Sequence, residues 1–124
     1  MSPLNLTCRE LPGGVLITVT GELDATNADR LESYAEQHHR PGLGMILDLG
    51  ELTFLDSRGL HVLLRLNTSV HDQGGILRLA AVRGRPARLL QITGVWPILV
   101  IHPDAEQAAA AMRCLTIDQP EKES

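Results

Sequence analysis

The sequence predicts one α/β domain built on a mixed sheet of about five strands with about four helices, in the order ββαβαβαβα. Short apolar stretches typical of buried strands alternate with longer stretches of helical spacing. Near the N-terminus, an alternating stretch is interrupted by residues 12–14, Pro-Gly-Gly, as in a β-hairpin. The length of 124 residues suits one compact core. Because strands separated by helices pair in parallel through right-handed crossovers, the hairpin makes the sheet mixed.

The hairpin and the first helix are predicted from the N-terminal third of the chain. Residues 4–11 and 15–20 alternate apolar and polar side chains, which indicates two antiparallel strands. Thr26, with Asp29 three residues later, resembles a capping box that begins a helix. This helix is expected to end near residues 41–42, Pro-Gly, because neither residue favours a helix interior.

The centre of the chain carries the most informative pattern. Residues 45–49 predict a buried strand, and a short apolar link then leads to residues 56–59, Asp-Ser-Arg-Gly. A leucine-rich helix is expected from Ser57 to about Asp72. Ser57 is thereby placed at a helix N-terminus, where free N–H groups and the helix dipole favour negative charge.

Two further strands and a short helix are expected next. Residues 76–82 predict the first strand, and Pro86 suits the first turn of a helix that ends before Gly94. Residues 98–101 are wholly apolar, as expected of a strand covered on both faces.

A last helix is predicted after Asp104, whose side chain is suited to cap it. Alanines and Met112 recur at helical spacing behind this cap. We therefore expect the domain to span residues 1–117, followed by a polar and disordered tail over residues 118–124.

The composition argues against nucleic-acid binding. The formal net charge is −4 and the sequence pI is about 5.7, whereas general nucleic-acid binders carry a basic excess. The aromatic residues Tyr34, Phe54 and Trp96 are too scattered for base stacking. Arginines do gather between Arg78 and Arg88, either as a solvated rim or as a surface for an acidic partner.

Metal, membrane and secretion signals are not found in the sequence. Cys8 and Cys114 lie near opposite ends without the spacing of a zinc site. No apolar stretch approaches the ~18 residues that span a bilayer, and the N-terminus does not resemble a signal peptide. We therefore expect a cytoplasmic protein with reduced cysteines, no cofactor, no membrane contact and no direct nucleic-acid contact.

Three roles are open to Ser57: nucleophile, helix cap or phosphate acceptor. A hydrolase is disfavoured because Leu55 stands where a nucleophile elbow has glycine. In addition, neither His61 nor His102 comes with a recognisable triad partner. Nucleotide hydrolysis is disfavoured because the sole lysine, Lys122, lies in the tail and no phosphate-binding loop occurs. We therefore predict that the protein is not an enzyme.

Capping and phosphate acceptance both remain, and the two are compatible. Serine and aspartate are favoured at helix N-termini, so Ser57 can be a plain cap. The same position suits a phosphate, and Gly59 can allow another backbone to approach closely.

Three motifs occur in an order that is characteristic of one family. Residues 21–26, GELDAT, match a motif that opens the first helix. Residues 47–59, LDLGELTFLDSRG, match a hydrophobic strand, a link and a D-S-x-G turn. Residues 92–95, ITGV, match an element before the last strand. Over about residues 4–113 the chain thus resembles the STAS-domain family, and specifically its small stand-alone members, the bacterial anti-anti-sigma factors (anti-sigma factor antagonists).

This resemblance implies a partner-switching role. In such systems an anti-sigma factor that is also a serine kinase holds a sigma factor inactive, and the unphosphorylated antagonist binds that kinase and frees the sigma factor. Phosphorylation of the D-S-x-G serine breaks the complex, and a phosphatase resets it. By motif position this serine is Ser57. The implied partner-binding residues are Glu22, Asp24, Thr26, Asp56, Ser57, Arg58, Gly59 and His61.

Two positions depart from the family's pattern. Arg58 stands where a small residue is usual, and His61 stands where glycine is frequent. Both enlarge the contact surface, and Arg58 adds a charge suited to an acidic partner or to a phosphate on Ser57. These residues indicate either a restricted set of partners or a STAS adaptor or ligand-sensing module that is not phosphorylated.

Overall fold

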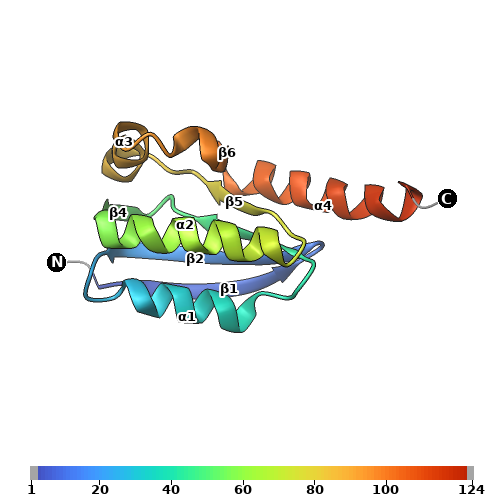
Figure 1. Ribbon diagram of the computed structural model, residues 1–124, viewed down its shortest axis with the longest axis horizontal. Helices are drawn as coiled ribbons and strands as arrows, with labels where there is room; N and C mark the ends of the chain where they lie inside the picture. The colour runs from blue at the N-terminus through green and yellow to red at the C-terminus, as the bar shows by residue number, and fades with distance from the viewer. Residues whose placement is uncertain (1–2, 123–124) are drawn as a thin grey trace.

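Strands and helices follow one another along the chain nearly as the sequence predicts (Figure 1). The computed structural model describes the backbone of residues 3–122 and the side chains of residues 3–114. The strands in this part of the chain are β1 (Asn5–Leu11), β2 (Gly14–Leu23), β3 (Gly44–Asp48), β4 (Leu52–Leu55), β5 (Leu77–Ala80) and β6 (Val100–His102). The helices are α1 (Ala28–His38), α2 (Ser57–Asp72), α3 (Gly84–Ile92), the short 3-10 helix η1 (Trp96–Ile98) and α4 (Ala105–Lys122).

The strands form one mixed sheet in the order β1-β2-β3-β5-β6, with β4 paired to β2. β1 and β2 are antiparallel and the other pairs are parallel, which confirms the predicted mixed sheet. The long strand β2 pairs first with β3, over residues 14–18, and then with β4, over residues 21–23. Gly21, at φ 101°, lies where the register shifts. The predicted apolar link is therefore a further strand, too short to show a period in the sequence.

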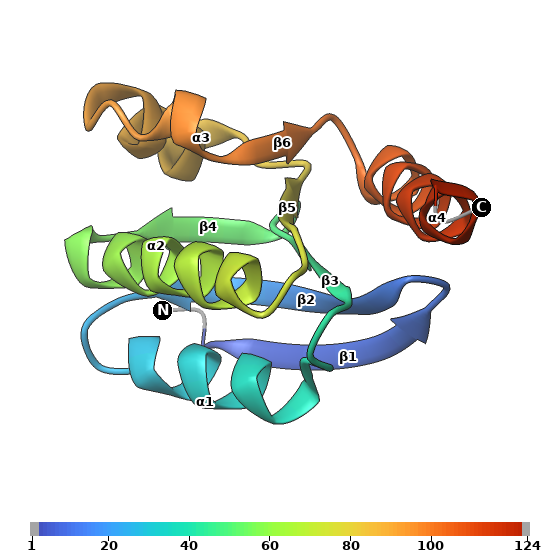
Figure 2. The ribbon, with the colours of Figure 1, turned by 45° about the vertical axis from the view of Figure 1, so that its right-hand side comes forward.

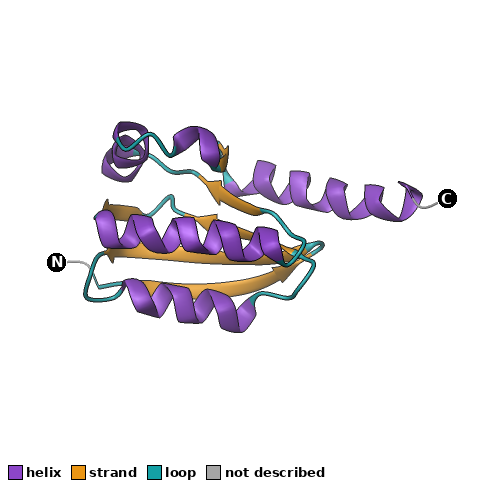
Figure 3. Cartoon of the chain, in the orientation of Figure 1, coloured by secondary structure: helices purple, strands orange, loops and turns teal. Residues whose placement is uncertain are grey.

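The helices divide between the two faces of the sheet (Figures 2 and 3). α1 and α2 pack together over one face, and α4 packs over β3, β5 and β6 on the other. Successive residues of β2 show this division, because Ile17 belongs to the large core under α1 and α2, whereas Leu16 belongs to the smaller core under α4. Since β2 and β4 run parallel, the turns that begin α1 and α2 meet at the same end of the sheet.

The predicted capping box at the start of α1 is wrong. The helix begins at Ala28, its N-cap is Asn27, and no side-chain cap hydrogen bond is formed. The Thr26 hydroxyl instead donates to the carboxylate of Asp24 at 2.6 Å. Thr26 therefore stabilises the preceding loop, because a short local bond to a carboxylate competes successfully with capping.

The C-terminal part differs from the expectation for residues 98–101. Residues Trp96–Ile98 form η1, and the strand lies later, at Val100–His102. β6 pairs only with β5 at the edge of the sheet, so Val100 is 39% exposed and the strand is not covered on both faces.

Asp104 caps α4 as predicted, because its carboxylate accepts the N–H of Gln107 at 2.8 Å. α4 continues to Lys122, into the stretch for which the sequence predicts a disordered tail, and residues 123–124 lie outside the described residues. Within the described residues, none of the helices is both long enough and apolar enough to cross a membrane.

Candidate functional site

Two loops that are distant in sequence meet beside the start of α2. The first follows β2 and carries Asp24, and the second follows β4 and carries Asp56. One carboxylate oxygen of Asp56 accepts the N–H of Gly59 at 2.9 Å and so caps α2, while the other accepts the N–H of Ala25 at 3.0 Å. The Asp56 N–H also donates to the carbonyl of Leu23 at 3.3 Å. Asp56 therefore joins the two loops by hydrogen bonds, so that they form one continuous surface.

Ser57 occupies the first position inside α2, so Asp56 and not Ser57 is the N-cap. The Ser57 side chain is exposed, and its hydroxyl makes no hydrogen bond within the described residues. The backbone N–H groups of Ser57 and Arg58 likewise find no backbone acceptor in the described part of the chain. An accessible hydroxyl thus stands beside two free donors and the positive end of the α2 dipole, which is an arrangement that accommodates a phosphate.

Local hydrogen bonds give the Asp24 loop a defined shape. The Asp24 carboxylate accepts the hydroxyl of Thr26 at 2.6 Å and its N–H at 2.9 Å. Asn27 closes the loop from the other side, because its side chain accepts the Asp24 N–H and donates to the carbonyl of Glu22, both at 2.9 Å. The bonds from Thr26, above all that from its hydroxyl, lower the pKa of the Asp24 carboxyl below its usual value. Asp24 is therefore a partly exposed and ionised group.

Asn27 is a residue that the sequence analysis missed. It directly precedes the observed helix α1 and belongs to the residue types favoured at N-caps, which is the signal that the sequence offers. Its side chain bonds back to the loop and not forward into α1, so the bonding itself is not deducible from its position.

Gly59 is buried, and the backbone that approaches it belongs to this chain. A Cβ at this position would lie 2.7 Å from Cδ1 of Leu55, 3.0 Å from Cγ of Leu23 and 3.1 Å from the Leu23 carbonyl oxygen. The close backbone approach expected at Gly59 is therefore made within this chain, by the Leu23 carbonyl. Its role is to let α2 start close against the end of β2.

Arg58 and His61 are neighbours on the surface of α2. Both are exposed and form no ion pair or hydrogen bond within the described residues. Residues one apart on a helix do not face each other, whereas residues three or four apart do. His61 therefore neighbours both Ser57 and Arg58, whereas Ser57 and Arg58 do not face each other.

The remaining predicted elements lie around this site without adding catalytic groups. The ITGV stretch, residues 92–95, ends α3, which packs against β4 directly before Asp56. His102 lies in β6, where its Nε2 is 3.0 Å from Nη1 of Arg78. No group of three side chains suited to hold a metal ion occurs among the described residues.

The arginines between residues 78 and 88 do not form one surface. Arg78 is buried, and its guanidinium contacts His102. Arg83 donates to the carbonyl of Gly50, at 2.9 Å from Nη2. Arg83, Arg85 and Arg88 are exposed. The suggested surface for an acidic partner is thus reduced to these three side chains at α3, one of which donates to a carbonyl of this chain.

Comparison with known families decides the classification. Residues 5–108 match the STAS domain family. The chain belongs to the STAS domain family. The structure of an anti-sigma factor antagonist from Mycobacterium paratuberculosis has the same fold, with a TM-score of 0.79 at 23% sequence identity, over 90% of this chain and 95% of that one.

Two STAS relatives are similar over nearly their whole length. A putative anti-sigma factor antagonist, BtrV, from Bordetella bronchiseptica is 28% identical over 111 residues, which are 89% of this chain and 96% of the relative. The anti-sigma-B factor antagonist of Bacillus subtilis is 29% identical over 107 residues, which are 83% of this chain and 94% of the relative.

Proposed function

We propose that the protein is a cytoplasmic anti-sigma factor antagonist that binds an anti-sigma factor with serine kinase activity, and that phosphorylation of Ser57 ends this binding. A phosphatase then restores the free hydroxyl. The observation that carries the proposal is the exposed and unbonded Ser57 hydroxyl at the first position of a capped helix. The names of the two relatives support the same role.

The chemistry asked of this chain is that of a substrate and not of a catalyst. In the kinase site the Ser57 oxygen attacks the γ-phosphorus of ATP, a kinase base takes the hydroxyl proton, and ADP leaves. Burial of the serine, or a strong bond to its hydroxyl, would hinder this attack. Neither applies to Ser57, because the Asp56 side chain takes over the capping role.

Phosphorylation is expected to leave the fold intact and to break the complex. A phosphoserine carries ~−1.5 to −2 charges near pH 7. At the start of α2 this charge gains roughly 0.3–1 kcal/mol from the helix dipole. In a closely fitted interface, a dianion that faces like charge or unpaired acceptors costs several kcal/mol, and each ~1.4 kcal/mol is tenfold in affinity. The interface effect therefore outweighs the effect on the helix.

Asp24 is proposed as the second contact of the partner surface. Its carboxylate is partly exposed, ionised and joined to the Ser57 turn through the Asp56–Ala25 hydrogen bond. A basic group of the kinase is its complementary partner. Glu22, near the end of β2, and Thr26, on the loop, extend this contact.

Titration calorimetry against an anti-sigma factor kinase from the same genome tests the proposal. Ser57→Ala is expected to bind as tightly as the unphosphorylated wild type, since the hydroxyl makes no intramolecular bond. Ser57→Asp and the phosphoprotein are expected to bind at least about tenfold more weakly and to melt near the wild type. Intact-mass measurement after incubation with kinase and ATP should show one phosphate on the wild type and none on Ser57→Ala.

Ser33→Asp provides the matched control, because Ser33 is an exposed serine on α1, away from the Ser57 turn. This variant should bind the kinase like the wild type. Equal affinities for the wild type, Ser57→Asp and the phosphoprotein would refute the switch and favour a STAS adaptor in which Ser57 carries no regulatory charge.

A further inference from the structure

The open edge of the sheet lies next to a groove that the Ser57 site does not use. Among the strands of the described residues, β1 is the outermost and pairs only with β2. The backbone groups on its outer side therefore have no strand partner, and an edge of this kind is a template for an added strand. A groove of about 420 Å³ runs between this edge and α1.

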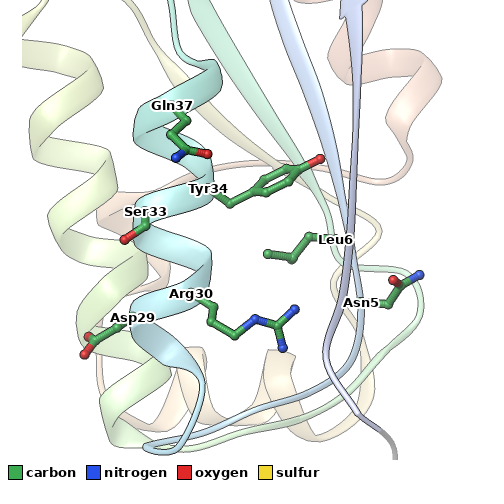
Figure 4. Close-up of a pocket in the computed structure, with 7 residues that line it drawn as sticks. All are labelled: Asn5, Leu6, Asp29, Arg30, Ser33, Tyr34 and Gln37. Carbon is green, nitrogen blue, oxygen red and sulfur yellow. The ribbon is translucent and has the colours of Figure 1, made fainter.

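Three side chains face the space between β1 and α1 (Figure 4). Leu6 extends from β1 toward the helix, Tyr34 extends over it from α1, and Arg30 reaches into the same space one helical turn earlier. Asp29 and Ser33, two further lining residues of α1, point away from the strand. The groove therefore has an apolar part and a single cation.

The Tyr34 ring is held in place, and Arg30 is free. The ring packs against that of His38, with 4.3 Å between their centres. Arg30 is exposed and forms no ion pair or hydrogen bond within the described residues. At the other end of β1, by contrast, Arg40 forms an ion pair with Glu10. The arginine at one end of the space between strand and helix is thus paired with a carboxylate, Glu10. Arg30, at the other end, has no carboxylate partner within the described residues.

We propose that the edge of β1 and this groove bind an extended peptide segment of a partner protein as an additional strand. Side chains two residues apart share one face of a strand, and Tyr34 and Arg30 lie one helical turn apart on α1. The peptide therefore carries an apolar residue over Leu6 and Tyr34 and, two positions later, an aspartate or glutamate at Arg30. This order follows from antiparallel pairing with β1, the more stable arrangement. Main-chain hydrogen bonds to β1 supply affinity, and the apolar part of the groove together with Arg30 supplies selectivity.

The probe is a blocked heptapeptide of threonines with leucine at position four and glutamate at position six. Binding is measured by NMR titration and by hydrogen exchange of the β1 amides in the full chain. We expect shifts confined to β1 and α1, together with slower exchange in β1. Arg30→Gln should weaken binding about tenfold, and replacing the peptide's glutamate by glutamine should do the same. Combining both changes should weaken binding no further, because they remove one contact.

Arg88→Gln, which removes an exposed arginine from α3, is the matched control and should bind the peptide like the wild type. A peptide that is N-methylated along its backbone should not bind, because it cannot pair with the strand. The proposal is overturned if the peptide does not bind at about 1 mM, the limit of weak affinity, or if Arg30→Gln binds it unchanged. It is also overturned if the β1 amides become protected in a concentration-dependent dimer without peptide, because a second copy then occupies the edge. The kinase is absent from these experiments, so their outcome is independent of the Ser57 switch.

Discussion

The Asp56 carboxylate accepts the N–H of Ala25 at 3.0 Å, although 31 residues separate the two in sequence. The same carboxylate caps α2 through Gly59. A single side chain thereby sets both the start of the helix that presents Ser57 and the position of the loop that presents Asp24. The spacing of these two groups on the partner surface depends on Asp56.

Asp56→Asn should separate capping from the bond between the loops. Asparagine is also a good N-cap, but it has only one acceptor oxygen, so Gly59 can be capped while the N–H of Ala25 loses its acceptor. We expect a loss of about 1 kcal/mol in the free energy of unfolding, faster hydrogen exchange at Ala25 and weaker kinase binding. Asp104→Asn, which changes a cap that forms no second bond, should cost less in urea unfolding. Equal losses for both variants would contradict a joining role of Asp56.

Gly59→Ala should destabilise the fold, although alanine normally favours a helix over glycine by roughly 1 kcal/mol. The new methyl group would lie 2.7 Å from Leu55 Cδ1 and 3.1 Å from the Leu23 carbonyl oxygen. Overpacking of this kind costs about 1–3 kcal/mol, and Gly59→Val should cost more. Thermal unfolding monitored by circular dichroism provides the measurement. A variant that melts at or above the wild-type temperature would show that α2 can shift freely away from β2.

Arg58→Ser should weaken kinase binding and flatten its dependence on salt, because an exposed cation without an internal partner is lost. Calorimetry at two ionic strengths measures both effects. His61→Ala serves as the comparison, since His61 is the exposed neighbour of Arg58 three residues along α2. Tighter binding by Arg58→Ser would instead identify Arg58 as an obstacle that excludes wrong partners.

Asp24→Asn should lower kinase affinity while the melting temperature at neutral pH changes little, since asparagine retains an oxygen for Thr26. The lowered pKa of Asp24 means that its contribution to stability is present above the carboxyl's usual pKa of 3.8 and is lost as the pH falls further. Relative to neutral pH, the wild type should therefore lose stability in strong acid that Asp24→Asn does not lose. Unchanged kinase binding would reduce Asp24 to a residue that shapes its own loop.

Protonation of His102 should make the protein less stable in mild acid. Its Nε2 faces the Arg78 guanidinium, which can only donate, so the ring is neutral in this arrangement. Burial and, to a lesser extent, Arg78 lower the pKa of His102, and the carboxylate of Asp104 opposes them. A histidine with a lowered pKa favours folding fully above its usual pKa of 6.5, and this contribution is lost as the pH falls below that value. His102→Gln should flatten this part of the stability curve, whereas His71→Gln, at an exposed position, should leave it unchanged.

Much of the architecture can be predicted from residues that are close together in the sequence. Hydrophobic periodicity identifies the hairpin, the bounds of α2 and the helix capped by Asp104, because each depends on side chains close in sequence. The four-residue strand β4 was not predicted, and β6 was predicted with shifted bounds. A strand of this length has too few residues to display a period, and its existence depends on pairing with a distant neighbour.

The candidate site likewise has some features that follow from local sequence and others that depend on tertiary contacts. The sequence by itself determined that Ser57 begins a helix and that Asp24 lies in the turn before another, since both follow from neighbouring residues. Only the tertiary structure decided that Asp56 and not Ser57 is the cap, that Asp56 reaches Ala25, and that Gly59 is required by Leu23. The last two relationships join residues more than thirty positions apart, and they arise because parallel pairing of β2 with β4 brings the ends of both strands together. Contacts of this kind are set by the packing of the sheet, and no local pattern encodes them.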